Sequence, residues 1–350
     1  MIKKSLIIMG CLILMIFPVY AEEKPLEPSS KEEPKIEEKK LKNEKENTNN
    51  ETFKYPQNKV TGFSQIQFLL EQSDSIHNEL KVYRARFGIK GDLNKDIGYK
   101  LIIGGLEPPD KNSHIVDAFV DLNYIPYAKI KIGQFLVPFG LEGPEIITVN
   151  PAIERSITIR QLNYFNMFRD IGIQISNKFD KFNYALAVVN GLGANPSKNK
   201  DYKDVLSRVG ITPIEGLELG ASAHWGKYIS ETTKDYLDRY RLGIDFEYLK
   251  DLFRLRGEFI WNSNSEINKY GWYILGGYKL FFLPELEVIA RLEQYEPDIK
   301  IGNNNLDIVT LGLNYFFINN TRFSINYEFR NDNSGSKLGN LLTTQMQVAF

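Results

Sequence analysis

The most constraining feature of the chain is an alternation of apolar and charged side chains that recurs from residue 59 to the C-terminus. In residues 239–248, apolar side chains occupy the even positions and charged ones occupy most of the odd positions. In residues 253–261, Arg254, Arg256 and Glu258 again alternate with apolar side chains. A period of two places successive side chains on opposite faces of a β-strand. The sequence therefore predicts an all-β protein whose strands have one apolar and one charged face.

Segments of this kind follow one another along the chain, and they predict sixteen strands. Their expected bounds are residues 59–70, 80–91, 96–106, 113–124, 127–137, 169–178, 181–190, 205–213, 217–228, 238–249, 252–263, 270–282, 286–297, 306–317, 322–330 and 341–350. An even number of antiparallel strands places both ends of the chain on one side of the sheet.

The connections between these segments alternate between long and short. The long connections include 71–79, 138–168, 191–204 and 331–340, and the short ones include 93–95, 125–126, 214–216, 283–285 and 318–321. A soluble β-sandwich also has alternating strands, but its turns do not sort by parity and its strands are usually shorter. Short turns on one side and longer loops on the other are typical of outer-membrane barrels.

Tyrosine and phenylalanine lie near many of the predicted strand ends, as in the aromatic girdles of membrane barrels. Examples are Tyr124, Tyr127, Tyr248 and Phe329. We therefore expect residues 55–350 to form a transmembrane antiparallel β-barrel of about sixteen strands. Its surroundings are expected to be the outer-membrane lipid of a Gram-negative-type bacterium.

The N-terminus has the layout of an export signal. Lys3 and Lys4 precede an apolar run over residues 6–17, and Val19-Tyr20-Ala21 forms a small-x-small cleavage pattern. A transmembrane anchor is the alternative, but the run is shorter than the roughly 20 residues that span a bilayer as a helix. A lipoprotein signal at Cys11 is a further alternative, although the apolar run continues past this residue. We predict a signal peptide over residues 1–21, cleaved near Ala21.

Residues 22–54 are rich in glutamate and lysine, contain three prolines and end in an Asn-rich patch. Such a segment has little apolar surface to bury, so it is expected to be a disordered periplasmic tail. A partner-binding or wall-facing arm is the alternative. At the other end, Phe350 terminates an alternating strand. A terminal aromatic of this kind resembles the C-terminal signal that the barrel assembly machinery recognises.

The composition disfavours several other classes of protein. Lys+Arg is 43 and Asp+Glu is 44, so the chain lacks the basic excess typical of nucleic-acid binding. The single cysteine lies in the predicted signal peptide, and the three histidines have no metal-ligand spacing, so neither a metal nor a cofactor is expected. Serine, histidine and acidic residues are not grouped in a catalytic motif, which disfavours an enzyme.

Three stretches carry a resemblance to a known family. They are residues 129–142 (KIKIGQFLVPFGLE), residues 168–175 (FRDIGIQI) and residues 183–193, which contain Val189-Asn190-Gly191. Together they resemble the phosphate-selective porin O and P family. The resemblance implies a sixteen-stranded homotrimeric porin with anion or phosphate selectivity. It also implies that the third outer loop, residues 138–168, folds into the lumen and narrows the pore.

An aqueous pore for small anions or other hydrophilic solutes needs a wet lumen and a series of weak binding sites. Guanidinium and ammonium groups on the charged strand faces and at the third outer loop could supply such sites for anions. The candidate residues are Arg84, Arg86, Lys90, Lys129, Lys131, Arg155, Arg160, Arg169, Arg241, Arg254 and Arg256. Arg208, Arg239 and Arg291 are further residues expected on the lumen face.

Other observations leave anion selectivity open. Residues 55–350 contain 33 basic and 34 acidic residues, and several acids are also expected to face inward. The phosphate-selective members of the family carry lysines in the third loop, whereas residues 138–168 contain none. A general diffusion pore therefore remains an alternative. A structural or adhesive barrel without a conducting lumen is a second alternative.

Overall fold

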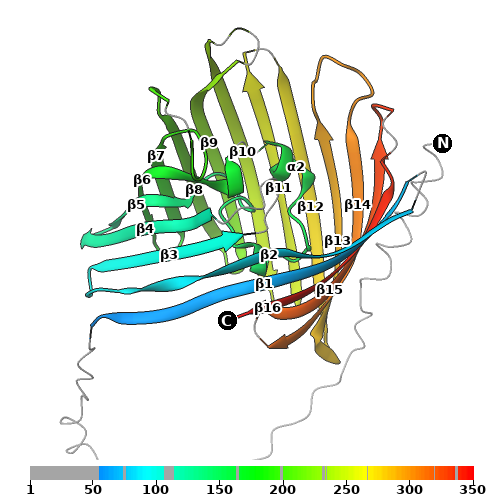
Figure 1. The fold of residues 1–350 in the computed structure, drawn as a ribbon, viewed down its shortest axis with the longest axis horizontal. Coiled ribbons are helices and arrows are strands. Elements are labelled where there is room, and N and C mark those ends of the chain that lie inside the picture. Colours follow the sequence, from blue (N-terminus) through cyan, green and yellow to red (C-terminus); the bar gives the residue numbers. More distant parts are fainter. Residues whose placement is uncertain are drawn as a thin grey trace, which may run out of the picture. The chain divides into compact units, whose positions relative to one another are not determined.

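The computed structural model describes residues 55–350, apart from 74–75, 106–113, 163–164, 198–199, 231–232, 234, 266, 319 and 336–337. The predicted signal peptide (1–21) and almost all of the predicted tail (22–54) lie outside the described residues. The described chain forms sixteen antiparallel strands closed into one barrel (Figure 1). Each strand pairs with its neighbours in sequence, and the last strand pairs with the first. A closed barrel leaves no unpaired sheet edge.

The strands agree closely with the predicted segments. They are β1 (Gln57–Gln72), β2 (Ile76–Asp92), β3 (Ile97–Gly105), β4 (His114–Ile125), β5 (Ala128–Leu136), β6 (Arg169–Lys178), β7 (Phe182–Val189), β8 (Asp204–Ile214), β9 (Leu217–Ile229), β10 (Tyr236–Lys250), β11 (Phe253–Asn264), β12 (Asn268–Leu280), β13 (Leu283–Glu296), β14 (Leu306–Ile318), β15 (Thr321–Asp332) and β16 (Asn340–Ala349). The expected all-β barrel of sixteen strands is confirmed.

The predicted long loop at 71–79 is wrong. Strands β1 and β2 extend through most of this segment, and Gln72 pairs with Ile76. The backbone ladder therefore continues past the point where the apolar alternation stops. Most other connections follow the expected parity: turns 126–127, 215–216 and 251–252 have two residues each, whereas 137–168 and 190–203 are long. The connection 265–267 is an exception, because it lies on the side of the long loops and has only three residues.

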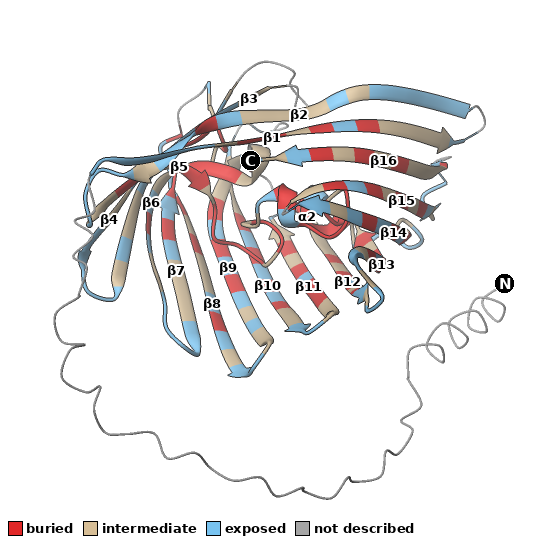
Figure 2. Ribbon diagram, turned by 90° about the horizontal axis from the view of Figure 1, so that it is seen from below, coloured by how far each residue is buried: buried red, intermediate tan, exposed pale blue. Residues whose placement is uncertain are grey.

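The alternation of side chains is inverted relative to a soluble protein. In β10, Ile244 is 63% exposed on the outer face, while Arg241 is fully buried on the inner face. Figure 2 shows the same alternation of buried and exposed positions along many strands. An apolar outer face and a polar lumen are the arrangement of a transmembrane barrel. Among the helices that the structure describes, none has the length and hydropathy of a membrane span.

Residues 137–168 fold into the barrel, and we call this segment the inner loop. It contains the short helices η1 (Ile147–Val149), α2 (Ile157–Leu162) and η2 (Asn166–Phe168). Figure 2 shows α2 within the ring of strands. Its apolar side chains, including Phe139, Ile159 and Leu162, are buried together with lumen-facing residues such as Ile260 and Tyr273. The hydrophobic core therefore lies inside the lumen, between the inner loop and the wall.

Candidate functional site

The inner loop is held in shape by its own polar groups. The Glu142 carboxylate accepts hydrogen bonds from the Asn150 side-chain amide at 2.7 Å and from the Ser156 backbone N–H at 3.0 Å. The Arg155 guanidinium donates to the backbone carbonyl oxygens of Glu142 and Glu145. Burial of this guanidinium lowers the pKa of Arg155 to about 10. These bonds fold residues 142–156 back on themselves.

A second set of hydrogen bonds ties the inner loop to strands β14 and β15. Arg322 donates to the carbonyl oxygen of Asn150 at 2.5 Å, and Asn314 donates to that of Pro151 at 2.8 Å. The Ile153 N–H donates to the Asn326 side-chain oxygen at 2.7 Å. Buried backbone groups require such partners, because leaving them unpaired is unfavourable. The loop is therefore docked against one side of the lumen.

Two ion pairs join the inner loop to other strands. Glu154 lies 3.0 Å from the Arg84 guanidinium on β2, and Glu145 lies 3.0 Å from that of Arg256 on β11. Burial opposes ionisation of Glu154, but the Arg84 guanidinium outweighs burial and holds the pKa of this carboxyl below its usual value. For Glu145, burial dominates and raises the pKa despite Arg256. The two carboxylates thus differ in how well their surroundings stabilise the charge.

Open space remains on the opposite side of the lumen, as three cavities of about 390, 310 and 380 Å³. Lys100 borders all three, so the cavities adjoin one another. The first cavity is lined by β1–β5. The second lies between residues 146–149 and β1–β4, with further lining residues from β6 and from the C-terminal end of β16. The third lies between residues 138–146 and β3–β8. We call the three cavities together the basic passage.

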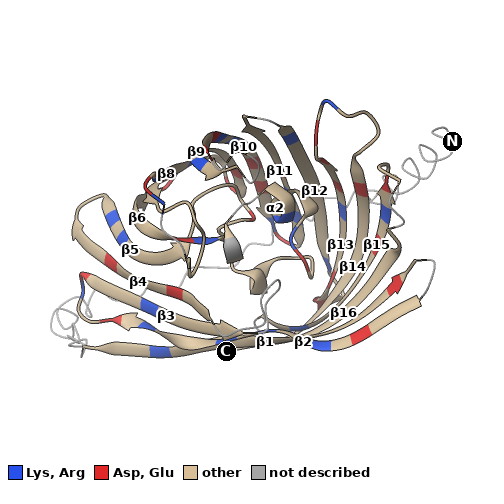
Figure 3. Cartoon of the chain, turned by 45° about the horizontal axis from the view of Figure 1, so that its top comes forward, with Lys and Arg blue, Asp and Glu red and all other residues tan. Residues whose placement is uncertain are grey.

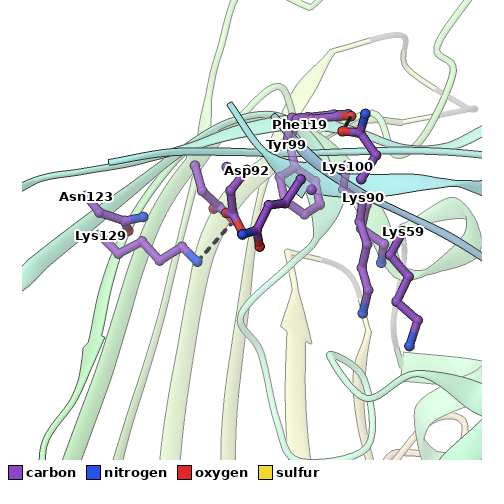
Figure 4. A pocket seen from close by; sticks show the side chains of 13 residues that line it. Lys59, Lys90, Asp92, Tyr99, Lys100, Phe119, Asn123 and Lys129 are labelled. Carbon is purple, nitrogen blue, oxygen red and sulfur yellow. Dashed lines mark hydrogen bonds and ion pairs between the residues drawn. The ribbon is translucent and has the colours of Figure 1, made fainter. Parts of the chain in front are cut away.

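The wall of the basic passage carries a row of three lysines. Lys59 on β1 pairs in register with Lys90 on β2, which pairs with Lys100 on β3. Figure 4 shows the three side chains together at the first cavity. Lys100 lies 2.7 Å from Asp117, but neither Lys59 nor Lys90 has an ion-pair partner among the described residues. Like charges directly opposite each other destabilise a sheet, so the row is unfavourable for folding alone.

The local charge balance of the basic passage differs from that of the whole barrel. Three acidic residues line it, Asp92, Asp117 and Asp121. Eight basic residues line it: Lys59, Arg86, Lys90, Lys100, Lys129, Lys131, Arg169 and Arg208. Figure 3 shows charged residues distributed around the whole ring of strands. The basic excess is therefore a property of this side of the lumen.

Comparison with known proteins agrees with this geometry. A sequence profile of the phosphate-selective porin O and P family matches residues 53–248 and 232–350. The chain belongs to this family. It is therefore an outer-membrane porin, a channel rather than an enzyme. No curated protein sequence matches the chain.

Solved structures show the same fold as this porin at low sequence identity. The anion-selective porin from Comamonas acidovorans has a TM-score of 0.62 at 14% identity, covering 84% of this chain and 100% of that one. The channel DcaP of Acinetobacter baumannii has a TM-score of 0.62 at 12% identity, covering 84% and 97%. The trimer form of OmpT from Vibrio cholerae has a TM-score of 0.61 at 13% identity, covering 84% and 99%.

The structure divides the residues predicted for the pore of this porin into two groups. Arg86, Lys90, Lys129, Lys131 and Arg169 line the basic passage, as does the further lumen-face candidate Arg208. Within the passage, Lys129 pairs with Asp121 at 3.1 Å and Arg169 pairs with Asp117 at 2.6 Å. These residues come from β2, β5, β6 and β8.

The second group lies outside the basic passage. Arg84, Arg155 and Arg256 bond to the inner loop, and the buried Arg241 donates to the carbonyl oxygen of Leu162 and to His224. Arg254 lines a further cavity beside β11–β15, which shares Val149 and Asn320 with the second cavity. Arg160 is exposed on α2. Of the further candidates, Arg291 donates to the carbonyl oxygen of Glu154 and Arg239 to Asp204.

Lys59 and Lys100 were not among the predicted pore residues. Both lie on inward-facing positions of strands whose segments were predicted, so the alternation alone could have placed them on the lumen face. Their alignment with Lys90 depends on strand register, which the sequence does not display. Among the residues that the structure describes, no group of three or more histidine, cysteine or acidic side chains could hold a metal ion.

Proposed function

We propose that this porin is an anion-preferring diffusion channel for small solutes, and that the Lys59–Lys90–Lys100 row is its main source of preference. The observation that carries the proposal is the alignment of the three lysines on adjacent strands beside open space. Fixed positive charge in a narrow aqueous passage raises the local concentration of anions and lowers that of cations. A series of separate ammonium groups also offers successive weak sites from which an anion can move on.

The similarity to a porin described as anion-selective supports this proposal, as does membership of a family described as phosphate-selective. The chemistry of the passage supports anion preference more strongly than specificity for phosphate. The inner loop contains no lysine, so every ammonium group of the passage comes from the strands of the wall. The loop contributes only the guanidinium groups of Arg155, which is bonded within the loop, and of Arg160, which is exposed on α2. A general diffusion pore is the corresponding alternative.

The oligomeric state, export and membrane assembly of the porin are part of the same proposal. We infer a homotrimer in the outer membrane, supported by the trimer form of the structurally similar OmpT. The many exposed apolar side chains on the outer face suit lipid and neighbouring subunits. We further propose that a signal peptide is cleaved near Ala21, that residues 22–54 remain as a periplasmic tail, and that Phe350 is recognised by the barrel assembly machinery.

Single-channel recording in a planar bilayer under a potassium chloride gradient tests the preference. The reversal potential gives the ratio of anion to cation permeability. We expect the wild-type porin to favour chloride. The double variant Lys59→Gln/Lys90→Gln is expected to lower the ratio by about twofold per lysine at low salt, and less at high salt. These two lysines are chosen because neither has an ion-pair partner among the described residues.

A matched control is Lys178→Gln/Lys250→Gln, which removes the same charge from exposed lysines at the ends of β6 and β10. This variant is expected to keep the wild-type ratio of anion to cation permeability. If the wild-type porin conducts without preferring anions, the proposed anion preference is wrong and the protein is a general diffusion pore. No current from a correctly folded barrel would contradict the channel itself and favour a structural role.

A further inference from the structure

The side of the basic passage that faces the lysine row is apolar. Ile146 and Val149 of the inner loop line the second cavity, opposite Lys59 and Lys100. Inside the lumen, Ile146 is 44% exposed and Val149 is 39% exposed. Apolar surface in contact with water is unfavourable, and the lumen of a porin is otherwise polar. These two side chains therefore need an explanation other than packing.

The local backbone explains why the two side chains point the same way. Residues 147–149 form a turn of 3₁₀-helix, with Ile146 at its N-terminus. Side chains three residues apart eclipse each other on such a helix. Ile147 and Thr148 between them are buried, so Ile146 and Val149 form one exposed apolar face.

Hydrogen bonds from the wall hold this turn in place. The Gln347 side-chain amide donates to the carbonyl oxygen of Thr148 at 3.0 Å, and Arg322 donates to that of Asn150 at 2.5 Å. The Val149 N–H also donates to the carbonyl oxygen of Ile146 at 3.1 Å. A pinned turn presents its apolar face in a fixed position, as a binding surface does.

The wall opposite combines cationic groups with aromatic rings. In the second cavity, the Arg86 guanidinium lies 5.4 Å from the centre of the Phe63 ring. In the adjoining third cavity, the Lys131 ammonium lies 4.4 Å from that of Phe119. Phe63, Arg86, Ile146 and Val149 all line the second cavity. A solute in this cavity thus meets positive charge on one side and hydrocarbon on the other.

We propose that the second cavity selects small organic anions with an apolar body, whose charged group contacts Lys59 and Lys100 while the body covers Ile146 and Val149. The inference rests on the proposed anion preference and names its substrate class. An inorganic anion leaves the apolar face hydrated, whereas an organic anion buries it. The cavity volume of about 310 Å³ falls at the small end of ligand sites, which suits a compact molecule.

Block of the chloride current by two matched carboxylates tests this inference. Cyclohexanecarboxylate and shikimate each carry one carboxylate on a six-membered ring, but the shikimate ring bears hydroxyl groups. We expect cyclohexanecarboxylate to produce half-block at a concentration about fivefold lower than shikimate, because more apolar surface is buried. Inorganic phosphate, compared at a pH where it is monovalent, is expected to block least.

The double variant Ile146→Thr/Val149→Thr replaces the apolar face with hydroxyl groups of similar size. It is expected to bring cyclohexanecarboxylate to the level of shikimate while leaving the chloride-to-potassium permeability ratio unchanged. The control Ile299→Thr/Ile301→Thr also replaces two exposed β-branched apolar residues by threonine, but in an outer loop, and should keep the fivefold difference.

The outcomes separate this inference from the proposed function. If the wild-type porin prefers anions but the two carboxylates block equally, or phosphate blocks most strongly, the substrate class is wrong and the anion preference stands. If the wild-type porin does not prefer chloride, the underlying function fails instead. Retention of the fivefold difference in the Ile146→Thr/Val149→Thr variant would show that another surface binds the apolar body.

Discussion

Arginine and lysine have different roles inside this lumen. Arg84, Arg155, Arg256 and Arg322 are largely buried and donate to carbonyl or carboxylate oxygens of the inner loop. Lys59 and Lys90 instead extend into open space. A planar guanidinium with several fixed donors suits the first task, and a flexible, well-hydrated ammonium suits weak contact with a passing ion.

At this scale, the sequence predicted which side chains face inward but not what they contact. Arg86 and Arg84 occupy the same inward face of β2, yet one lines the basic passage and the other holds Glu154. The difference arises because the inner loop approaches one of them, and the partners are 70 residues apart in the chain. No local pattern encodes such a contact.

We predict that Glu154→Gln and Glu145→Gln change the stability of the porin unequally. Arg84 holds the pKa of Glu154 below its usual value, so the ionised carboxylate stabilises the folded state. Replacing this carboxylate by the amide of glutamine should lower the free energy of unfolding by about 1–3 kcal/mol at neutral pH. Burial raises the pKa of Glu145, so its ionised form is disfavoured, and the neutral glutamine should cost less or even stabilise.

The pH dependence of the free energy of unfolding tests the same prediction, because the two glutamates should change it in opposite directions. The Glu154 contribution is present above the usual glutamate pKa of about 4.3 and is lost as pH falls through its lower folded-state pKa. The Glu145 penalty is present above its raised pKa and disappears as pH falls toward the usual value. Urea unfolding in detergent at neutral and acidic pH measures both. Equal destabilisation by the two substitutions would refute the prediction.

At the scale of elements, alternation was sufficient to place sixteen strands, because each one has a lipid face and a water face. It failed at 71–79, where β1 and β2 continue in a polar stretch with no apolar face to mark them. The alternation also did not predict the path of the inner loop through the lumen. That course depends on hydrogen bonds such as Arg322 to Asn150, whose partners are 172 residues apart.

The docking of the inner loop predicts the effect of removing one of its anchors. Asn326→Leu should leave the buried N–H of Ile153 without its acceptor, which is unfavourable by about 1–3 kcal/mol. We expect residues 150–154 to detach part of the time, so single-channel recordings should show more open-state noise and a larger mean conductance. The control Asn78→Leu alters an exposed asparagine on β2 and should leave the recordings unchanged. Wild-type noise in the Asn326→Leu variant would mean that the remaining bonds suffice to hold the loop.

At the scale of the whole molecule, the barrel closes where its two ends meet. Phe350 and Gly62 exchange backbone hydrogen bonds of 3.0 and 3.1 Å, which extends the pairing of β16 with β1. The Phe350 ring lies so close to Gly62 that a Cβ there would lie 2.9 Å from its edge. Phe350 and Lys59 both line the second cavity, so the closure of the barrel also builds one wall of the basic passage.

The ring of Phe350 could act as a signal for assembly or could help to close the barrel. The variant Phe350→Ala distinguishes these two roles. The variant keeps the backbone hydrogen bonds to Gly62 and loses only a ring that is 61% exposed. If the ring acts as a signal for assembly, the amount of folded porin in the outer membrane should fall several-fold. The purified and refolded variant should still form conducting channels. Phe317→Ala removes a similarly exposed ring beside another short turn and should leave both quantities unchanged. A normal amount of folded Phe350→Ala porin in cells would exclude the signalling role. A refolded variant that fails to conduct would instead show that the ring is needed to close the barrel.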